Sequence, residues 1–204
     1  MPTVFTHMLV GAAAAQLAPA GVPKARLAAL LALAAAAPDL DVIGFSMGIP
    51  YGARLGHRGL SHSLLFAAVL GAAVAAAVLA RRQIPWRHWL ATATIAVLAV
   101  ASHGLLDAAT DAGLGIGFLI PFSDERFFLP FRPMDTAPLN PQRFFTAGRW
   151  RLMLSEMLWV WLPLTLLTLS HQLGRWMVRP AHRRMPVEQQ FEFRKGTQGN
   201  EVID

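Results

Sequence analysis

The sequence predicts an all-α integral membrane protein, a helical bundle of about five segments of which some are short or half-spanning. The chain of 204 residues is 54% hydrophobic and only 15% charged, whereas soluble domains are about 25% charged. Its mean hydropathy is +0.42. Residues 63–80 carry no charge and stop at Arg81 and Arg82, and a run of this length approaches the roughly 20 residues that a spanning helix needs.

The helical segments are expected near residues 6–18, 26–37, 62–80, 86–110 and 150–178. The first two contain short apolar stretches that are half-spanning, buried against other helices, or parts of longer helices bent at Pro19 and Pro38. Beside 63–80, the candidate spans are 89–106, which is interrupted only by His103, and 157–174, which is expected to kink at Pro163. Residues 1–179 should form one membrane domain that carries the site, and 180–204 a polar, flexible tail.

Composition excludes several classes of protein. The chain contains no cysteine, which rules out a thiolate metal site, a disulfide framework and a cysteine nucleophile. We expect no cleaved signal, because no Lys or Arg precedes the first apolar stretch. A net charge of +6 is compatible with nucleic-acid binding, but the basic residues flank hydrophobic helices, as the positive-inside rule predicts. We therefore expect no nucleic-acid partner.

Charge also predicts how the chain is oriented in the membrane. If the helices alternate, most of the 18 basic residues fall on one side, including Lys24, Arg26, Arg81 and Arg82. That side is predicted to be cytoplasmic. The protein would then be a multi-pass inner (plasma) membrane protein, with the loops 40–61 and 112–148 on the extracytoplasmic side.

Histidine and aspartate gather at segment ends that this orientation places on the extracytoplasmic side. The strings are F-T-H at the start, P-D-L-D at 38–41, H-R-G-L-S-H-S at 57–63 and S-H-G-L-L-D-A-A-T-D at 102–111. Imidazole and carboxylate together are the ligand set of zinc, manganese or iron. The candidate site residues in these strings are His7, Asp39, Asp41, His57, His62, His103 and Asp107.

Spacing supports this cluster, although each string also has a structural interpretation. His103 and Asp107 are four residues apart and share a helix face, as an ion pair would also require; Asp111 follows on that face if the helix continues. Asp39 and Asp41 follow a proline, as turn residues do, but carboxylates at a helix C-terminus oppose its dipole. We therefore expect a cation or Arg58 beside them.

Other polar residues receive supporting roles. Arg58 is a candidate clamp for a substrate anion, with Arg126 as a second, and Asp41 or an unligated histidine is a candidate general base. Asp41, His57 and Asp111 also fit positions that only hold a ligand in place. Ser61 is expected to cap the helix that begins near His62. Glu156 is a late ligand candidate, but pairing with Arg149 or Arg151 is favoured.

The order of these strings, followed by a P-F-S segment, resembles the YdjM-type inner-membrane proteins, described as membrane-bound metal-dependent hydrolases. The resemblance runs from about residue 3 to 130. It implies a distant similarity to zinc-dependent phospholipase C and S1/P1-type nucleases, which are all-helical. Carried over residue by residue, it implies metal ligation by His7, Asp39, His57, His62, His103 and Asp107.

The predicted function is a membrane-bound hydrolase that acts on a phosphoester or lipid-linked substrate through metal-activated water. The cofactor would be a divalent transition metal, zinc before others, in about one to three copies. Two alternatives stay open: a metal ion or proton transporter that uses the same cluster, and a non-catalytic membrane protein with a structural metal. A transporter needs polar residues spread across the membrane depth, whereas these gather at one end.

Overall fold

The computed structural model describes residues 1–138 and 150–177 and is helical throughout them, apart from loops and two isolated bridges. This confirms the predicted all-α class. The chain divides into two compact units, Met1–Leu164 and Thr165–Asp204. The predicted tail at 180–204 lies outside the described residues. The helices are α1 (Val4–Ala14), α2 (Lys24–Ala36), α3 (Ile43–Ser46), α4 (Leu64–Leu79), α5 (Trp86–Ala108), α7 (Trp150–Glu156) and α8 (Leu162–Met177).

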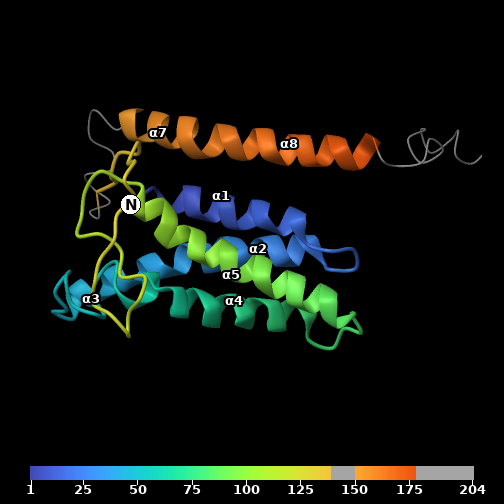
Figure 1. Ribbon diagram of the computed structural model, residues 1–204, viewed down its shortest axis with the longest axis horizontal. Helices are drawn as coiled ribbons and strands as arrows, with labels where there is room; N and C mark the ends of the chain where they lie inside the picture. Colours follow the sequence, from blue (N-terminus) through green and yellow to red (C-terminus); the bar gives the residue numbers. More distant parts are fainter. Residues whose placement is uncertain (139–149, 178–204) are drawn as a thin grey trace, which may run out of the picture. The chain divides into compact units, whose positions relative to one another are not determined.

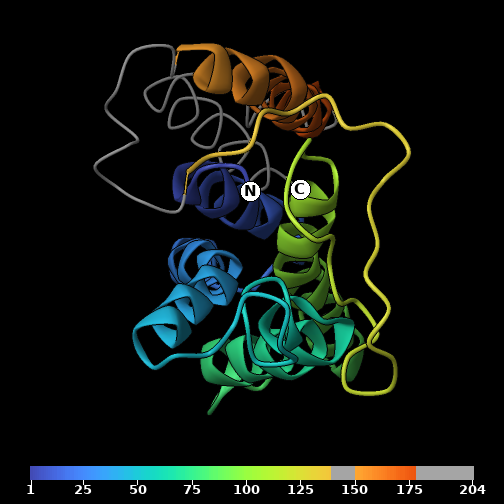
Figure 2. The same ribbon diagram turned by 90° about the vertical axis from the view of Figure 1, so that its left-hand side faces the viewer.

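Four helices of the first unit, α1, α2, α4 and α5, lie side by side (Figures 1 and 2). Their shared core is made mainly of alanine, valine and leucine, with Leu27, Leu31 and Val78 fully buried. Small residues permit close approach: a side chain at Gly71 would collide with the backbone of α5 at Val97. Such contacts are typical of helices that associate in lipid.

The long apolar stretches are Lys24–Ser46, Trp86–Ala108 and Trp150–Met177, each long enough to cross a membrane. The first is longer than expected, because a 3-10 helix at Ala37–Val42 joins α2 to α3. Pro38 lies in the first turn of that 3-10 helix, where its missing N–H costs nothing. Conversely, α4 has only 16 residues, which is shorter than the predicted run at 63–80 and below the roughly 20 that a straight span needs.

The last helical stretch is irregular one turn before Pro163. A π-helix at Met157–Trp161 separates α7 from α8, so Pro163 falls at the start of α8, where proline is tolerated. The irregularity that the sequence placed at Pro163 lies instead in this π-helical segment, a feature often found at functional sites. Residues 165–177 of α8 belong to the second unit.

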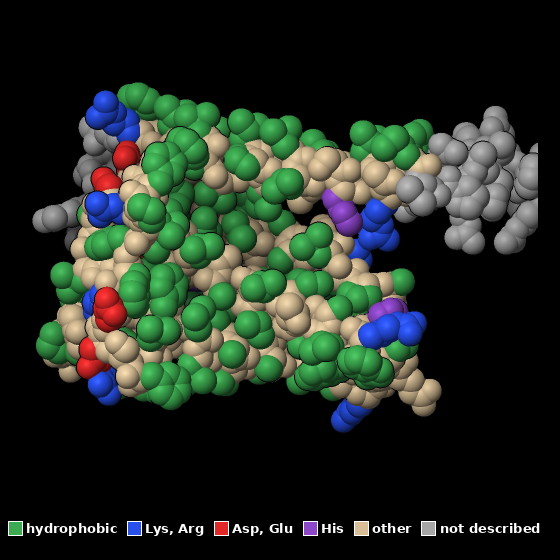
Figure 3. All heavy atoms as spheres, viewed as in Figure 1, with side chains coloured by type: hydrophobic (Ala, Val, Ile, Leu, Met, Phe, Trp, Pro, Cys, Tyr) green, Lys and Arg blue, Asp and Glu red, His purple; other side chains and the backbone are tan. Residues whose placement is uncertain are grey.

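Two loops, between α3 and α4 and after α5, cross one end of the bundle (Figure 2). Arg126 connects them, since its guanidinium donates to the carbonyl oxygens of Ala53 at 3.2 Å and of Arg58 at 3.2 Å. These contacts give Arg126 a structural role, and the second substrate clamp predicted for it stays a prediction. Charged side chains gather at the two ends of the bundle, and hydrophobic side chains cover the length between them (Figure 3).

Candidate metal centre

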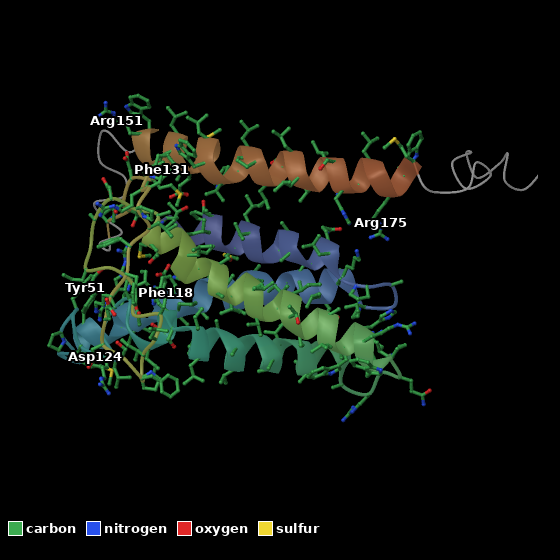
Figure 4. All side chains as sticks on the ribbon, viewed as in Figure 1. Tyr51, Phe118, Asp124, Phe131, Arg151 and Arg175 are labelled. Carbon is green, nitrogen blue, oxygen red and sulfur yellow. The ribbon has the colours of Figure 1, made fainter. Side chains whose placement is uncertain are left out.

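Four buried residues bring one possible ligand atom each to the same place at the loop-covered end of the bundle. They are Asp39 of the 3-10 helix after α2, His62 of the 3-10 helix Leu60–His62, and His103 and Asp107 of α5. The four ligand atoms lie within 4.8 Å of one another. Tyr51 and Phe118, which come from the two loops, mark this end of the bundle in Figure 4. Residues far apart in the sequence thus converge, as the sequence predicted.

His103 is held so that one ring nitrogen faces the cluster. Its Nδ1 lies 2.7 Å from the carbonyl oxygen of Ala35, which only accepts hydrogen bonds, so Nδ1 carries the hydrogen. Its Nε2 lies 3.0 Å from Nε2 of His62 and 3.3 Å from Oδ1 of Asp39. A histidine that donates its other N–H to a carbonyl is the usual arrangement of a metal ligand.

His62 is arranged like His103, except that its second ring nitrogen contacts a carboxylate in place of a backbone carbonyl. Its Nε2 lies 3.5 Å from Oδ2 of Asp107 and 3.8 Å from Oδ1 of Asp39. Its Nδ1 lies 3.2 Å from Oδ2 of Asp41. His62 therefore directs one nitrogen to the cluster and the other to an orienting carboxylate.

Asp41 is fully engaged by protein groups. Its Oδ2 accepts from the hydroxyl of Ser61 at 2.6 Å and from the backbone N–H of Arg58 at 3.2 Å. Its Oδ1 lies 2.7 Å from Nδ1 of His57. Asp41, His57 and His62 also form a second, partly buried group that could hold an ion. These contacts favour an orienting role for Asp41 over the general-base role suggested by the sequence.

Arg58 faces the protein and not an open cleft. Its side chain is 1% exposed, and its Nε lies 3.3 Å from Oδ2 of Asp107. Its terminal nitrogens donate to the carbonyl oxygen of Ala112 at 2.7 Å and to the hydroxyl of Thr110 at 3.0 Å. The guanidinium thus holds Asp107 and the turn after α5, and the substrate clamp predicted for it stays a prediction.

His7 lies against the cluster from α1. Its ring stacks on that of His103 with centroids 3.8 Å apart, and its Nε2 lies 3.5 Å from Oδ1 of Asp107. Neither ring nitrogen has a hydrogen-bond partner within the described residues. His7 is therefore an imidazole available for ligation or proton transfer.

A polar network that the sequence did not predict fixes the start of α1. Glu156 is completely buried and accepts from the backbone N–H and the hydroxyl of Thr3, both at 2.7 Å, and from the hydroxyl of Thr6. The indole N–H of Trp161 donates to the same Thr6 hydroxyl at 2.6 Å. Glu156 thus binds the threonines beside His7 and forms no ion pair with Arg151, whereas Arg149, the other predicted partner, lies outside the described residues.

The donor set fits a divalent cation. All four carboxylate oxygens of Asp39 and Asp107 are buried, and none has a hydrogen-bond partner in the described part of the chain. Buried carboxylates of this kind are costly unless positive charge lies beside them. Burial lowers the pKa of His62, but the carboxylates of Asp107, Asp39 and Asp41 outweigh burial and raise it to about 10. The cluster therefore attracts positive charge, and its nitrogen and oxygen donors suit zinc, manganese or iron.

Asp111 and Ser61 have contacts that differ from those predicted from the sequence. Asp111 is exposed and accepts from the backbone N–H and the hydroxyl of Thr136, at 3.0 and 2.7 Å, so it stabilises a loop. Ser63, and not Ser61, caps α4 by accepting from the N–H of Phe66 at 3.1 Å. Ser61 is instead free to bind Asp41, which no pattern in the sequence had indicated.

Comparison with known proteins agrees with this architecture. The profile of the family described as YdjM inner membrane protein matches residues 1–179. Inner membrane protein YbcI of Escherichia coli (strain K12) is 38% identical over 166 residues, which cover 80% of this chain and 92% of that relative. No solved structure matches the chain.

Proposed function

The chain belongs to the YdjM family of inner membrane proteins, and from that premise we propose that it is a metal-dependent hydrolase acting on phosphoester bonds of lipid-linked substrates. One observation carries the proposal. Asp39, His62, His103 and Asp107 converge within 4.8 Å, while the carboxylate oxygens of the two aspartates remain without hydrogen-bond partners among the described residues. Residues that served only the fold would have satisfied these oxygens.

The residues of the chain divide into ligands and groups that orient them. Asp39, His62, His103 and Asp107 would hold a divalent cation, zinc first among the candidates. Such a cation supplies the Lewis acidity that polarises a phosphoryl oxygen and activates water at neutral pH. Asp41 orients His62, and the carbonyl oxygen of Ala35 orients His103; Arg58 keeps Asp107 in place.

His7 is the proposed proton carrier. It lies beside the ligands but outside the group of four, and its Nε2 is 3.5 Å from Oδ1 of Asp107. An imidazole in this position can take a proton from the attacking water at Nε2 and then give it to the leaving oxygen. The stacking on His103 keeps the ring in place during both transfers.

The substrate class follows from where the cluster lies. The site is at one end of apolar helices that can span a membrane, so a phosphorylated head group would meet it at the lipid–water boundary. We propose that this boundary is the extracytoplasmic one, because most basic residues fall on the other side.

The described residues give the transporter alternative little support, because their buried ionisable groups gather at one end of the bundle. At the end of the described bundle away from the cluster, Thr92 is the one polar residue that is buried among those described. Its hydroxyl donates to the carbonyl oxygen of His88 within the same helix. Ion or proton translocation needs ionisable groups at successive depths. A hydrolysis assay distinguishes the proposed enzyme from a protein with a purely structural metal.

Purified protein in detergent should hydrolyse phosphatidylethanolamine, with products identified by mass spectrometry. Asp39→Asn should lower the rate by more than about a hundredfold, because ligand substitutions exceed the effects of orienting groups. Asp124→Asn makes the same chemical change on an exposed carboxylate that pairs with Arg54 and should leave the rate unchanged. Chelation should abolish turnover and added zinc should restore it. Stoichiometric metal without hydrolysis of any phospholipid would instead favour a structural metal.

A further inference from the structure

An apolar groove of about 540 Å³ lies between α1, α2 and α4. Every residue that lines it is alanine, valine, leucine or methionine, so its walls offer no side-chain hydrogen bond. The volume lies within the range of sites for small ligands, roughly 300–1,000 Å³. Its walls include Val4 and Met8 of α1, Leu30 and Leu33 of α2, Leu40 of the following 3-10 helix and Val74 of α4.

The groove adjoins the metal centre. Met8 directly follows His7 in α1, and Leu40 lies between Asp39 and Asp41. The same short segments therefore turn polar side chains to the cluster and apolar side chains to the groove. A molecule lying in the groove would have one end beside Asp39, which is 9% exposed.

The length of the groove matches one leaflet of a bilayer. Along its floor it runs from Leu30 to Leu40, which spans about 17 Å at roughly 1.5 Å per residue in the α-helix and 2.0 Å in the 3-10 helix. This is about half of the roughly 30 Å hydrocarbon core. The hydrocarbon tail of a lipid in the leaflet nearest the site has this reach.

We infer that the groove binds one acyl chain of a glycerophospholipid and thereby presents the head-group phosphate to the metal centre. The inference rests on the proposed function and names its substrate class. An acyl chain is the occupant favoured here because the groove belongs to a membrane-embedded bundle whose surroundings are lipid tails. The carboxylate-rich cluster beside the groove requires a cation before it accepts a phosphate.

Photo-crosslinking tests the groove without reference to turnover. The full chain is reconstituted in nanodiscs of phosphatidylethanolamine and phosphatidylglycerol that contain phosphatidylethanolamine with a diazirine midway along one acyl chain. After illumination, peptide mass spectrometry should find adducts concentrated in the peptides that contain Val4, Met8 and Leu33.

Two variants fill the groove from opposite walls, Leu33→Trp on α2 and Val4→Trp on α1. Each should reduce the adduct yield severalfold, because the indole occupies the space that the acyl chain would take. Leu98→Trp is the matched control, because Leu98 on α5 and Leu33 are both 63% exposed but only Leu33 lines the groove. Metal content equal to that of the unchanged protein shows that a variant is folded.

The outcomes separate the groove from the catalytic proposal. The acyl-chain proposal is overturned if adducts spread evenly over the lipid-facing helices. It is also overturned if the folded groove variants give the same adduct yield as Leu98→Trp. If the groove is labelled but no phospholipid is hydrolysed, the acyl-chain site is supported and the proposed hydrolase function is refuted. Hydrolysis that persists in both groove variants, with no groove labelling, retains the function and refutes the acyl-chain site.

Discussion

The buried pair of Asp107 and Arg58 offers a quantitative test of the centre. Both side chains are essentially unexposed, and Arg58 Nε lies 3.3 Å from Asp107 Oδ2. Asp107→Asn would leave the guanidinium buried without a counter-charge, and removing one partner of a buried ion pair costs about 3–5 kcal/mol. At roughly 2–4 °C per kcal/mol for chains of this length, Tm should fall by about 10 °C.

The double variant Asp107→Asn with Arg58→Met separates the effect of the buried charge on stability from the effect of Asp107 on metal binding. Methionine keeps the apolar stem without the charge but loses the hydrogen bonds to Ala112 and Thr110, so the double variant should regain part of the lost Tm while its metal content stays low. Tryptophan fluorescence follows unfolding in detergent with chelator present, so that bound metal does not contribute. The exposed pair Arg54–Asp124 is the control, and Asp124→Asn should change Tm little.

Two results would refute this reasoning. If the Tm losses of the two single substitutions simply add in the double variant, the residues do not interact as the 3.3 Å contact requires. If Asp107→Asn retains a full complement of metal, Asp107 is not a ligand.

Three further predictions follow from contacts described above. Glu156→Gln should lower the hydrolysis rate about tenfold while metal is retained, because Glu156 positions α1, and with it His7, through Thr6; an unchanged rate would remove this role. His7→Gln should retain metal but lose about 10²–10⁴-fold in hydrolysis rate if His7 carries a proton, whereas loss of metal would make it a ligand. An impermeant thiol reagent on intact cells should label Ser46→Cys but not Gln83→Cys, since the unchanged chain has no cysteine; the opposite pattern would invert the orientation.

The helical architecture was predictable because apolar runs and their charged ends are local features of the sequence. The membrane-spanning character of 86–108 and 150–177 follows from composition alone. The continuity of 24–46 was harder to predict, since Pro38 is equally compatible with a turn. In the structure Pro38 lies in the first turn of the 3-10 helix, where proline is tolerated, so the helical stretch continues and is not ended by a turn.

The convergence of the histidines and aspartates was predictable from sidedness, whereas their individual roles were not. Roles depend on which atoms face which, and those contacts join residues far apart in the sequence. Glu156 reaches Thr3 across 153 positions, and His103 is oriented by a backbone carbonyl that carries no sequence signal. Arg58 resembles a substrate clamp by residue type, but its donors are directed to Thr110 and Ala112.

Elemental mass spectrometry of the purified protein tests the central claim most directly, namely that Asp39, His62, His103 and Asp107 hold a divalent cation. The unchanged protein should contain at least one zinc, manganese or iron ion per chain. His103→Gln should lose it, because Nε2 of His103 faces the cluster. His88→Gln, whose histidine lies at the other end of the same helix, should retain it. Protein purified without chelator that holds no transition metal, or equal metal in both variants, would contradict the account.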